Sequence, residues 1–278
     1  IGANASLDNA PSGIAIGNGA VLNTANSGVA IGAGASILGA ENAVAIGREA
    51  TAGQVSVSIG EYAKANEAAV AIGSRAEATG ASSVAIGQHS EASAGGSTVV
   101  GRYANAGAMD ATALGIEANA AGASSFAAGA YTLASGDKSI AIGSGYDDSG
   151  NNRTEATGLR SVAVGHATQA TAEESSAYGF YAQATGYRGS AYGAFTEAKG
   201  EHSSAYGSNA QAMGVFSSAY GGGALASANN SIAISSGYIV DSNGRVTHTK
   251  ATAERAAAIG YMARATSADA LAIGSGAN

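Results

Sequence analysis

The sequence predicts an all-β chain that forms a parallel β-solenoid with 14-residue coils. Three observations predict this fold class: a short apolar phrase recurs along the chain, side-chain size alternates around it, and the composition lacks the bulky residues of an ordinary core. Of the 278 residues, 69 are Ala and 42 are Gly, whereas Val, Ile, Leu and Phe together make up roughly 16%. A single large core needs more large apolar side chains than this, so we expect thin repeated layers instead.

The repeat is a phrase ending in glycine, of the type found at residues 84–87, VAIG. It closes 19 times, and every closing residue is Gly except Ser235. The closing positions are 2, 17, 32, 47, 60, 73, 87, 101, 115, 129, 143, 165, 179, 193, 207, 221, 235, 260 and 274. Neighbouring positions are 13 to 15 residues apart, except for intervals of 22 and 25, which equal one 14-residue coil plus 8 or 11 inserted residues. A period of this kind indicates a repeat architecture, here of about 18 coils.

Each coil is expected to hold two short strands, because side-chain size alternates with a period of two on both sides of the closing residue. With the closing residue as position 0, positions −3 and −1 are mostly Val and Ile, −2 is mostly Ala, and −4 is Ser, Ala or Gly. Positions +3 and +5 are mostly Ala, while +4 and +6 are mostly polar. Gly near +7 indicates the second turn. We therefore expect strands of about five residues that pair from coil to coil at about 4.8 Å.

The two alternating sets are expected to face different surroundings. Where −1 becomes Tyr, as at Tyr192, −3 becomes Ser, so these positions share one closed space. The small set at −4, −2, +3 and +5 suits a thin coil interior, which leaves the Val, Ile and Tyr stripe to be buried between chains. Closed rotational symmetry is the usual solution, and we predict a homotrimer. Its core is expected to hold Ile86, Tyr178, Tyr192, Tyr206 and Tyr220. The alternative places Val and Ile inside each coil and the Ala face between chains.

Composition excludes several classes of protein. Thirteen Lys and Arg stand unclustered against 20 Asp and Glu, for a net charge of −7, so we expect no nucleic-acid partner. There is no Cys for a disulfide or a thiolate metal site, and no apolar run long enough for a membrane helix. The first residues lack the features of a signal peptide, which we expect to be absent or removed. The four His are far apart and none is paired with a nucleophile, so we expect no enzyme activity, no cofactor and no metal site.

Two insertions depart from the coil, near residues 144–153 and 236–247, and each follows a Ser-Gly-Tyr sequence. Asn243-Gly244 between β-branched stretches predicts a hairpin in the second, and we expect the first to leave the coil as a hairpin too. Such a hairpin serves either as a clamp on a neighbouring chain or as a ligand-binding surface. A third interpretation, a Ca²⁺ site at the adjacent carboxylates of the first insertion, lacks the alternating oxygen spacing of a calcium loop. The candidate ligand-binding residues are Tyr146, Asp147, Asp148, Asn151, Arg153, Tyr238, Asp241, Asn243 and Arg245.

Residues 83–87, SVAIG, and 139–143, SIAIG, belong to a 14-residue period with Ala-x-Ala between the phrases. In phrase and period together, essentially the whole chain resembles the head of YadA-like trimeric autotransporter adhesins. The resemblance implies one head domain over residues 1–278, folded as a left-handed parallel β-roll in an intertwined homotrimer. It also implies a non-enzymatic adhesin on the bacterial cell surface, anchored in the outer membrane by a region outside this chain. The implied partners are host extracellular-matrix proteins of the collagen, fibronectin or laminin class, with autoagglutination and virulence as frequent attributes of the family.

One alternative function stays open: a structural spacer in a surface fibre that presents another binding module. Two other solenoid classes fit poorly. A hexapeptide-type acyltransferase needs coils in multiples of six residues, and an ice-binding solenoid needs a uniform outward Thr ladder, whereas +4 and +6 here are mixed. Outward aromatic residues at +2 are further binding candidates, namely Tyr103, Tyr131, Tyr181 and Phe195.

Overall fold

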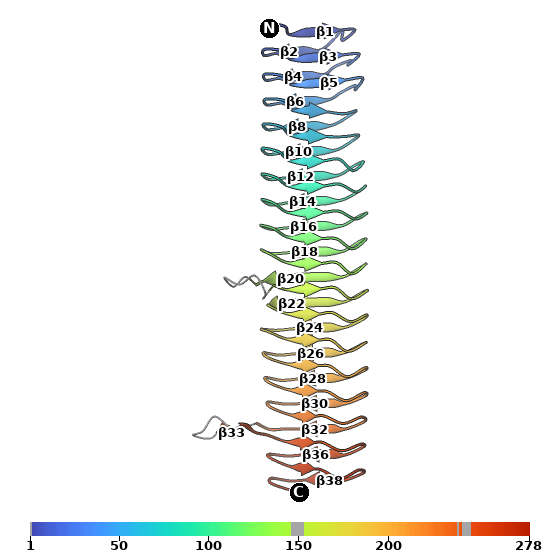
Figure 1. Ribbon diagram of the computed structural model, residues 1–278, viewed down its shortest axis with the longest axis vertical. Coiled ribbons are helices and arrows are strands. Elements are labelled where there is room, and N and C mark those ends of the chain that lie inside the picture. The colour runs from blue at the N-terminus through green and yellow to red at the C-terminus, as the bar shows by residue number, and fades with distance from the viewer. Residues whose placement is uncertain (1, 146–152, 238, 241–245) are drawn as a thin grey trace. The chain divides into compact units, whose positions relative to one another are not determined.

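The computed structural model describes residues 2–145, 153–237, 239–240 and 246–278. The chain is an all-β parallel β-solenoid of about 18 coils, which confirms the predicted fold class. It divides into two compact units, Ile1–Ala134 and Ser135–Asn278, and each unit repeats the same coil (Figure 1). The described ranges contain no helix, and so no helix that could span a membrane.

Each coil of the first unit contributes one strand to each of two parallel sheets. Sheet A holds the strands that follow the closing residue, and sheet B holds the strands that precede it. Sheet A of this unit consists of β1 (Ser6–Asp8), β3 (Val21–Asn23), β5 (Ser36–Leu38), β7 (Thr51–Ala52), β9 (Lys64–Ala65), β11 (Glu77–Ala78), β13 (Glu91–Ala92), β15 (Asn105–Ala106), β17 (Asn119–Ala120) and β19 (Leu133–Ala134). Sheet B of this unit consists of β2 (Ile14–Ile16), β4 (Val29–Ile31), β6 (Val44–Ile46), β8 (Val57–Ile59), β10 (Val70–Ile72), β12 (Val84–Ile86), β14 (Thr98–Val100), β16 (Thr112–Leu114) and β18 (Phe126–Ala128).

The second unit has the same alternation of strands. Its sheet A consists of β21 (Glu155–Ala156), β23 (Gln169–Ala170), β25 (Gln183–Ala184), β27 (Glu197–Ala198), β29 (Gln211–Ala212), β31 (Leu225–Ala226), β35 (Lys250–Ala251) and β37 (Arg264–Ala265). Its sheet B consists of β20 (Ile140–Ser144), β22 (Val162–His166), β24 (Ser176–Tyr178), β26 (Ser190–Tyr192), β28 (Ser204–Tyr206), β30 (Ser218–Tyr220), β32 (Ile232–Ile234), β36 (Ala257–Ile259) and β38 (Leu271–Ile273). The strands have two, three or five residues, shorter for the most part than the five expected, because the corners take up the remaining residues of each coil.

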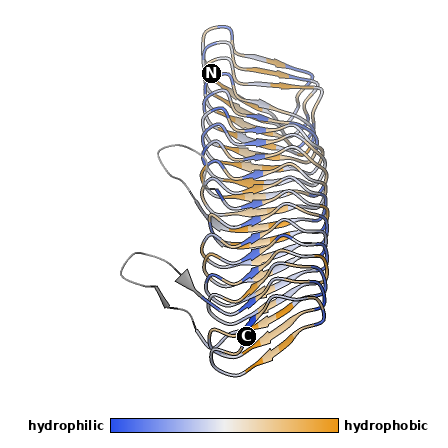
Figure 2. Ribbon diagram, turned by 60° about the horizontal axis from the view of Figure 1, so that its bottom comes forward, coloured by the Kyte–Doolittle hydropathy of each residue, from blue (hydrophilic) through white to orange (hydrophobic). Residues whose placement is uncertain are grey.

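Neighbouring strands of a sheet pair in parallel, so that residues at equivalent positions lie side by side. Ala71 pairs with Ala85 in the first unit, and Tyr178 pairs with Tyr192 in the second. Because the register never shifts by one residue, the inward and outward faces are kept from coil to coil. Figure 2 shows the result: hydrophobic and hydrophilic segments recur at the same place in successive coils of each unit.

The corners between the strands also pair from coil to coil. The N–H of Tyr62, at +2, donates to the carbonyl of Arg48 at 2.8 Å, and the N–H of Val55, at −5, donates to the carbonyl of Glu41 at 2.9 Å. Both donor residues have a positive φ, 57° for Tyr62 and 54° for Val55. A non-glycine residue pays about 1 kcal/mol or more for this conformation, and the conformation persists because it lets the corner amides pair with the next coil.

Alanine fills the interior of the coils. Among the described residues, the buried apolar side chains are all Ala except Leu22, Ile37 and Val99. The small set therefore faces inward, as predicted, and the alternative with Val and Ile inside the coil is wrong. Where a larger residue enters, the facing position shrinks: Leu22 lies at +5, and a Cβ on Gly28, at −4 of the same coil, would lie 3.0 Å from its Cδ2. Volume is thus balanced across a closely packed interior.

Some of the buried hydroxyls at −4 and +3 bind the carbonyls of the turns. Ser83 Oγ donates to the carbonyl of Gly80 at 2.7 Å, and Thr168 Oγ1 donates to the carbonyl of Gly179 at 2.5 Å. A buried hydroxyl without a partner costs free energy. These bonds offset the burial of the hydroxyls that make them. Other buried hydroxyls at −4, such as those of Ser139 and Ser203, have no hydrogen-bond partner among the described residues.

The closing residue is glycine because the next coil passes directly against it. At Gly60, φ is +138°, and a Cβ would lie 2.3 Å from the carbonyl oxygen of Gly73. Neither the conformation nor the space admits another residue. The one exception, Ser235, does not have a positive φ, and it lies where the second insertion leaves the coil.

The insertions leave the second unit on the C-terminal side of sheet B strands. The second one contains the antiparallel pair β33 (Ile239–Val240) and β34 (Val246–Thr247), which confirms a hairpin there. Residues 146–152 of the first insertion lie outside the described residues. Where it departs, β20 and β22 are extended by two residues, so that Ser144 pairs with His166.

We expect Gly73→Ala to destabilise the first unit by about 3 kcal/mol or more, because φ is +134° and the new Cβ would lie 2.5 Å from the carbonyl oxygen of Gly87. The matched control is Gly19→Ala, where φ is +66° and no atom lies within 4 Å of the Cβ, and where about 1 kcal/mol is expected. Thermal unfolding followed by circular dichroism measures both. Equal melting temperatures for the two variants would contradict the close contact between closing residues.

Candidate functional site

The outward side of sheet B is an apolar face in both units. Its side chains come from −3 and −1, which point away from the Ala-filled interior because successive residues of a strand face opposite sides. On the single chain, Ile72 is 37% exposed, Ile142 is 40% exposed and Tyr220 is 42% exposed. A continuous face of this kind is larger than isolated surface apolar residues and indicates an interaction surface.

In the second unit this face carries a ladder of four stacked tyrosines. The ring centroids of Tyr178 and Tyr192 are 4.7 Å apart, those of Tyr192 and Tyr206 are 4.9 Å apart, and those of Tyr206 and Tyr220 are 5.2 Å apart, with interplanar angles of 9°, 3° and 7°. These separations follow from the spacing of parallel strands. The predicted trimer-core residues of this unit therefore share one surface, and their burial between chains stays a prediction.

The ladder perturbs the acid–base behaviour of Tyr192. Burial raises the pKa of the Tyr192 phenol, and the neighbouring phenols of Tyr178 and Tyr206 raise it further, while a hydrogen bond with Ser176 acts in the opposite direction. A phenolate formed inside the ladder would be poorly hydrated and next to two further ionisable phenols. The ladder thus favours neutral tyrosine.

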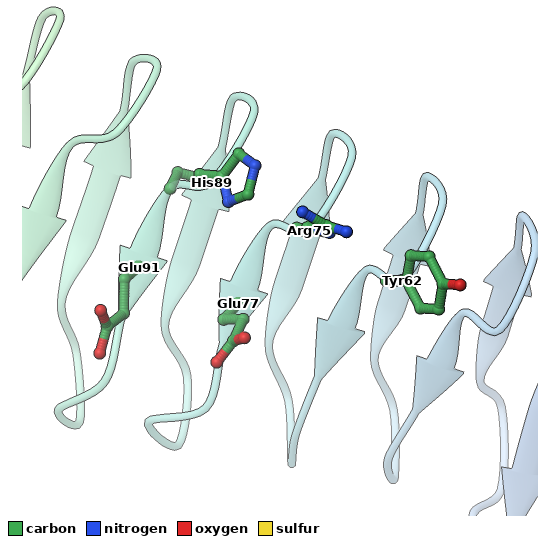
Figure 3. Close-up of a pocket in the computed structure, with 6 residues that line it drawn as sticks. Tyr62, Arg75, Glu77, His89 and Glu91 are labelled. Atoms are coloured by element: carbon green, nitrogen blue, oxygen red, sulfur yellow. The ribbon is translucent and has the colours of Figure 1, made fainter.

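A polar groove lies on the first unit, along the corner between sheets B and A. We call it the corner groove. It has a volume of about 420 Å³ and is lined by Tyr62, Arg75, Glu77, His89, Ser90 and Glu91. One wall comes from +2 of successive coils and the other from +4 (Figure 3). Because +3 points inward, the side chains at +2 and +4 stand on either side of a floor of small residues.

A second depression lies one coil further along the same corner. This depression has a volume of about 440 Å³ and is lined by Tyr103, Asn105, Glu117 and Asn119, again from +2 and +4. His89 and Tyr103 connect the two, since their rings stack at 4.9 Å between centroids with an interplanar angle of 13°. Five successive coils therefore contribute polar side chains to one continuous strip of surface.

The wall at +2 is cationic and aromatic. The guanidinium of Arg48 lies 4.6 Å from the ring centroid of Tyr62, and that of Arg75 lies 5.6 Å from the same centroid. Both distances are within the range of cation–π attraction. The opposite wall is anionic: Glu77 and Glu91 are direct neighbours in the register of β11 and β13.

Most charged corners of the second unit are already paired. Arg160 Nη2 lies 3.1 Å from Glu173 Oε1 and 2.8 Å from Glu174 Oε1, and Arg188 Nε lies 2.5 Å from Glu174 Oε2. The hydrogen bond from Arg188 lowers the pKa of Glu174. These pairs are exposed, so they contribute little to stability, but they use up hydrogen-bonding capacity that a ligand would need.

An aromatic cluster covers another corner of the second unit. The rings of His166 and Phe180 stack at 5.1 Å, Phe180 and Phe195 meet edge to face at 5.3 Å, and Tyr181 stacks on Phe195 at 5.7 Å. Phe180 and Phe195 are about half exposed. The cluster contains two of the outward aromatics named from the sequence, and the structure adds Phe180 and His166 to them.

Of the nine predicted ligand-binding residues, the structure describes one. Eight of the nine lie outside the described residues, namely Tyr146, Asp147, Asp148, Asn151, Tyr238, Asp241, Asn243 and Arg245. The ninth, Arg153, pairs with Glu155 at 2.6 Å between Nε and Oε1. Within the described part of the chain, no three His, Asp or Glu side chains gather into a possible metal site.

Sequence reasoning missed the corner groove. Its signal was present as two columns of residues, one at +2 and one at +4, read from coil to coil. From the sequence alone, the residues at +4 are identified only as mostly polar. What makes the columns a site is that +2 and +4 flank the same floor, and that depends on the corner conformation.

Comparison with protein families identifies one match. The family model described as YadA head domain repeat (2 copies) matches residues 67–90, 78–104, 120–145, 156–182, 184–210, 212–234 and 251–277. These segments cover more than half of the chain and lie in both units. No curated protein matches the chain significantly.

The tyrosine ladder predicts an alkaline limit to stability. Because the pKa of Tyr192 is raised in the folded state, its contribution is fully present below the ordinary tyrosine pKa of about 10 and is lost as the pH rises through the higher folded value. We expect the free energy of unfolding to fall above about pH 10, and to fall less steeply in Tyr192→Phe. Denaturant unfolding at a series of pH values measures this. An identical alkaline decline in the variant would contradict it.

Proposed function

Because this chain belongs to the YadA head family of trimeric autotransporter adhesins, we propose that it is an adhesive head that binds host extracellular-matrix proteins from the bacterial cell surface. The family supports an adhesin-type function and surface display. The matrix ligands, of the collagen, fibronectin or laminin class, and the anchoring of the whole protein in the outer membrane are parts of the proposal.

The family match carries the adhesive part of the proposal, and the apolar face of sheet B carries its trimeric part. Each coil fills its own interior with alanine, so Val, Ile and Tyr at −3 and −1 have no partner within the coil. Three copies arranged around an axis would bring three such faces together around a narrow central space. Large side chains fill such a space and alanine would leave it empty, which supports the homotrimer.

In this proposal the head works by multivalent binding without a chemical reaction. Each corner and outer face appears three times in the trimer, and equivalent positions recur along the coils. Weak contacts that are repeated in this way gain strength because every contact after the first forms at high local concentration.

We expect Tyr192→Ala to weaken the trimer, because it removes one ring per chain from the proposed core. By analogy with large-to-small core substitutions, the loss is about 3–5 kcal/mol per chain. The control is Tyr103→Ala, which removes an exposed corner ring. Sedimentation equilibrium measures both. A stable folded monomer of the unchanged chain would refute the trimer, and an unaffected Tyr192→Ala trimer would refute the placement of the ladder.

We expect the purified protein to bind immobilised collagen, fibronectin or laminin in a saturable manner. The trimer should bind more tightly than a dissociated variant, because binding is multivalent. Solid-phase binding assays test this, with intact host cells as a second target. Absence of binding to all three proteins and to the cells would contradict the adhesive head and leave the spacer as the better account.

A further inference from the structure

We propose that the corner groove binds an extended, uncharged glycan chain. This inference rests on the proposed adhesive function and names the class of ligand that this surface holds. The groove is the strip defined above by Tyr62, Arg75, Glu77, His89, Ser90 and Glu91, together with the depression that continues it. Neither the sequence pattern nor the family match assigns a ligand to it.

The chemistry of the walls indicates the ligand. No aliphatic side chain occurs among the described lining residues of either depression, and all of them carry a polar group. Protein partners are usually anchored by large side chains in apolar or aromatic pockets, which this surface does not offer. A carboxylate only accepts hydrogen bonds and a guanidinium only donates them, whereas a hydroxyl does both. A polyhydroxylated ligand can therefore satisfy both walls at once.

The carboxylates of the groove are free to bind, whereas Ser90 Oγ already donates to the carbonyl of Gly87 at 2.9 Å. Among the described residues, Glu77 and Glu91 make no ion pair and no side-chain hydrogen bond. Of the other described glutamates of the first unit only Glu61 is paired, with Arg48, whereas those of the second unit are paired, as Glu174 is with Arg188. The guanidinium of Arg75 lies 5.6 Å from the ring centroid of Tyr62, and among the described residues it forms no ion pair. Like charges at directly opposite positions of neighbouring strands destabilise a sheet, so the Glu77–Glu91 arrangement does not serve stability and stays available for hydrogen bonds from a ligand.

Charge selects an uncharged ligand over an anionic one. With neutral histidine, the residues that line the corner groove carry two carboxylates against one guanidinium, and Glu117 adds a third carboxylate in the second depression. Two cations lie beside them: Lys64 is the register neighbour of Glu77, and the guanidinium of Arg102 lies 5.4 Å from the ring centroid of Tyr103. The whole first unit has nine Asp and Glu against four Lys and Arg. This field repels sulfated or sialylated glycans and nucleic acid, and it leaves neutral sugars as the hydroxyl-rich ligands that fit.

The geometry selects an extended ligand. The lining residues come from five successive coils, spaced at about 4.8 Å, and each coil adds side chains at +2 and +4. The ring of Tyr62 already contacts guanidinium groups and that of His89 already contacts Tyr103. Hydrogen bonds to the edge of a sugar chain, rather than stacking on free ring faces, are therefore what the groove offers.

The test uses the purified chain and a panel of immobilised uncharged oligosaccharides, with sialylated and sulfated ones for comparison. We expect binding to uncharged members, and a loss of about tenfold or more in Glu77→Ala/Glu91→Ala, because hydrogen bonds to charged groups are among the strong ones. The matched control is Glu67→Ala, an exposed carboxylate of the same unit outside the groove. Removing two facing like charges should not lower the melting temperature, so thermal unfolding separates lost binding from lost structure.

The outcomes distinguish this inference from the function on which it rests. If no uncharged oligosaccharide binds, if only anionic ones bind, or if the double variant binds like the unchanged chain, the glycan site is refuted. Binding to matrix proteins that persists in any of these cases leaves the adhesive head in place. A chain that binds neither the panel nor matrix proteins and cells refutes both.

Discussion

Backbone hydrogen bonding between successive coils is the constraint on which the rest of this structure depends. Strands and corners alike donate to the coil before or after them, as Tyr62 does to Arg48. This pairing places equivalent residues of successive coils one strand spacing apart. A side chain at a given position must therefore pack against the side chain at the same position of the next coil. The closing glycines follow from it, because the carbonyl of Gly73 lies where a side chain of Gly60 would be.

The same constraint explains the unusual composition. A thin coil leaves room mainly for Ala, Ser, Thr and Gly inside, with Leu22, Ile37 and Val99 as the larger buried side chains, and Leu22 is accepted where glycine faces it. Bulky apolar residues are then excluded from the interior and collect on the outer side of sheet B. The chain thus lacks a large core of its own, and the proposed trimer provides one by joining three faces. Each coil of such a solenoid is stabilised by the neighbouring coils of its own chain, and in the proposed trimer also by the other two chains.

Coil-to-coil stacking also aligns equivalent side chains of successive coils into columns on the surface. Tyr178 and Tyr192 stack at 4.7 Å because their strands pair in register, and Glu77 faces Glu91 for the same reason. In the second unit, the corner carboxylate of Glu174 is neutralised by Arg188 and Arg160. In the first unit the corner groove keeps its carboxylates free. The family match establishes the type of head, and the difference between paired and unpaired columns points to where on this head a ligand binds.

The period, the two strands per coil, the inward alanine set and both insertions could be derived from the sequence, because one-dimensional spacing determines which side chains face the same way. The assignment of Ala inside and Val or Ile outside followed from size alone, as Tyr192 with Ser190 illustrates. The corner groove could not be derived in this way. Whether Arg75 and Glu77 flank one floor depends on the positive φ at +2, and whether Glu91 is paired depends on the side chains of neighbouring coils. The spacing in the sequence alone determined which residues form columns along the coils. Only the tertiary structure decided which columns lie next to each other, because the corner conformation sets the direction in which the side chains of each column point.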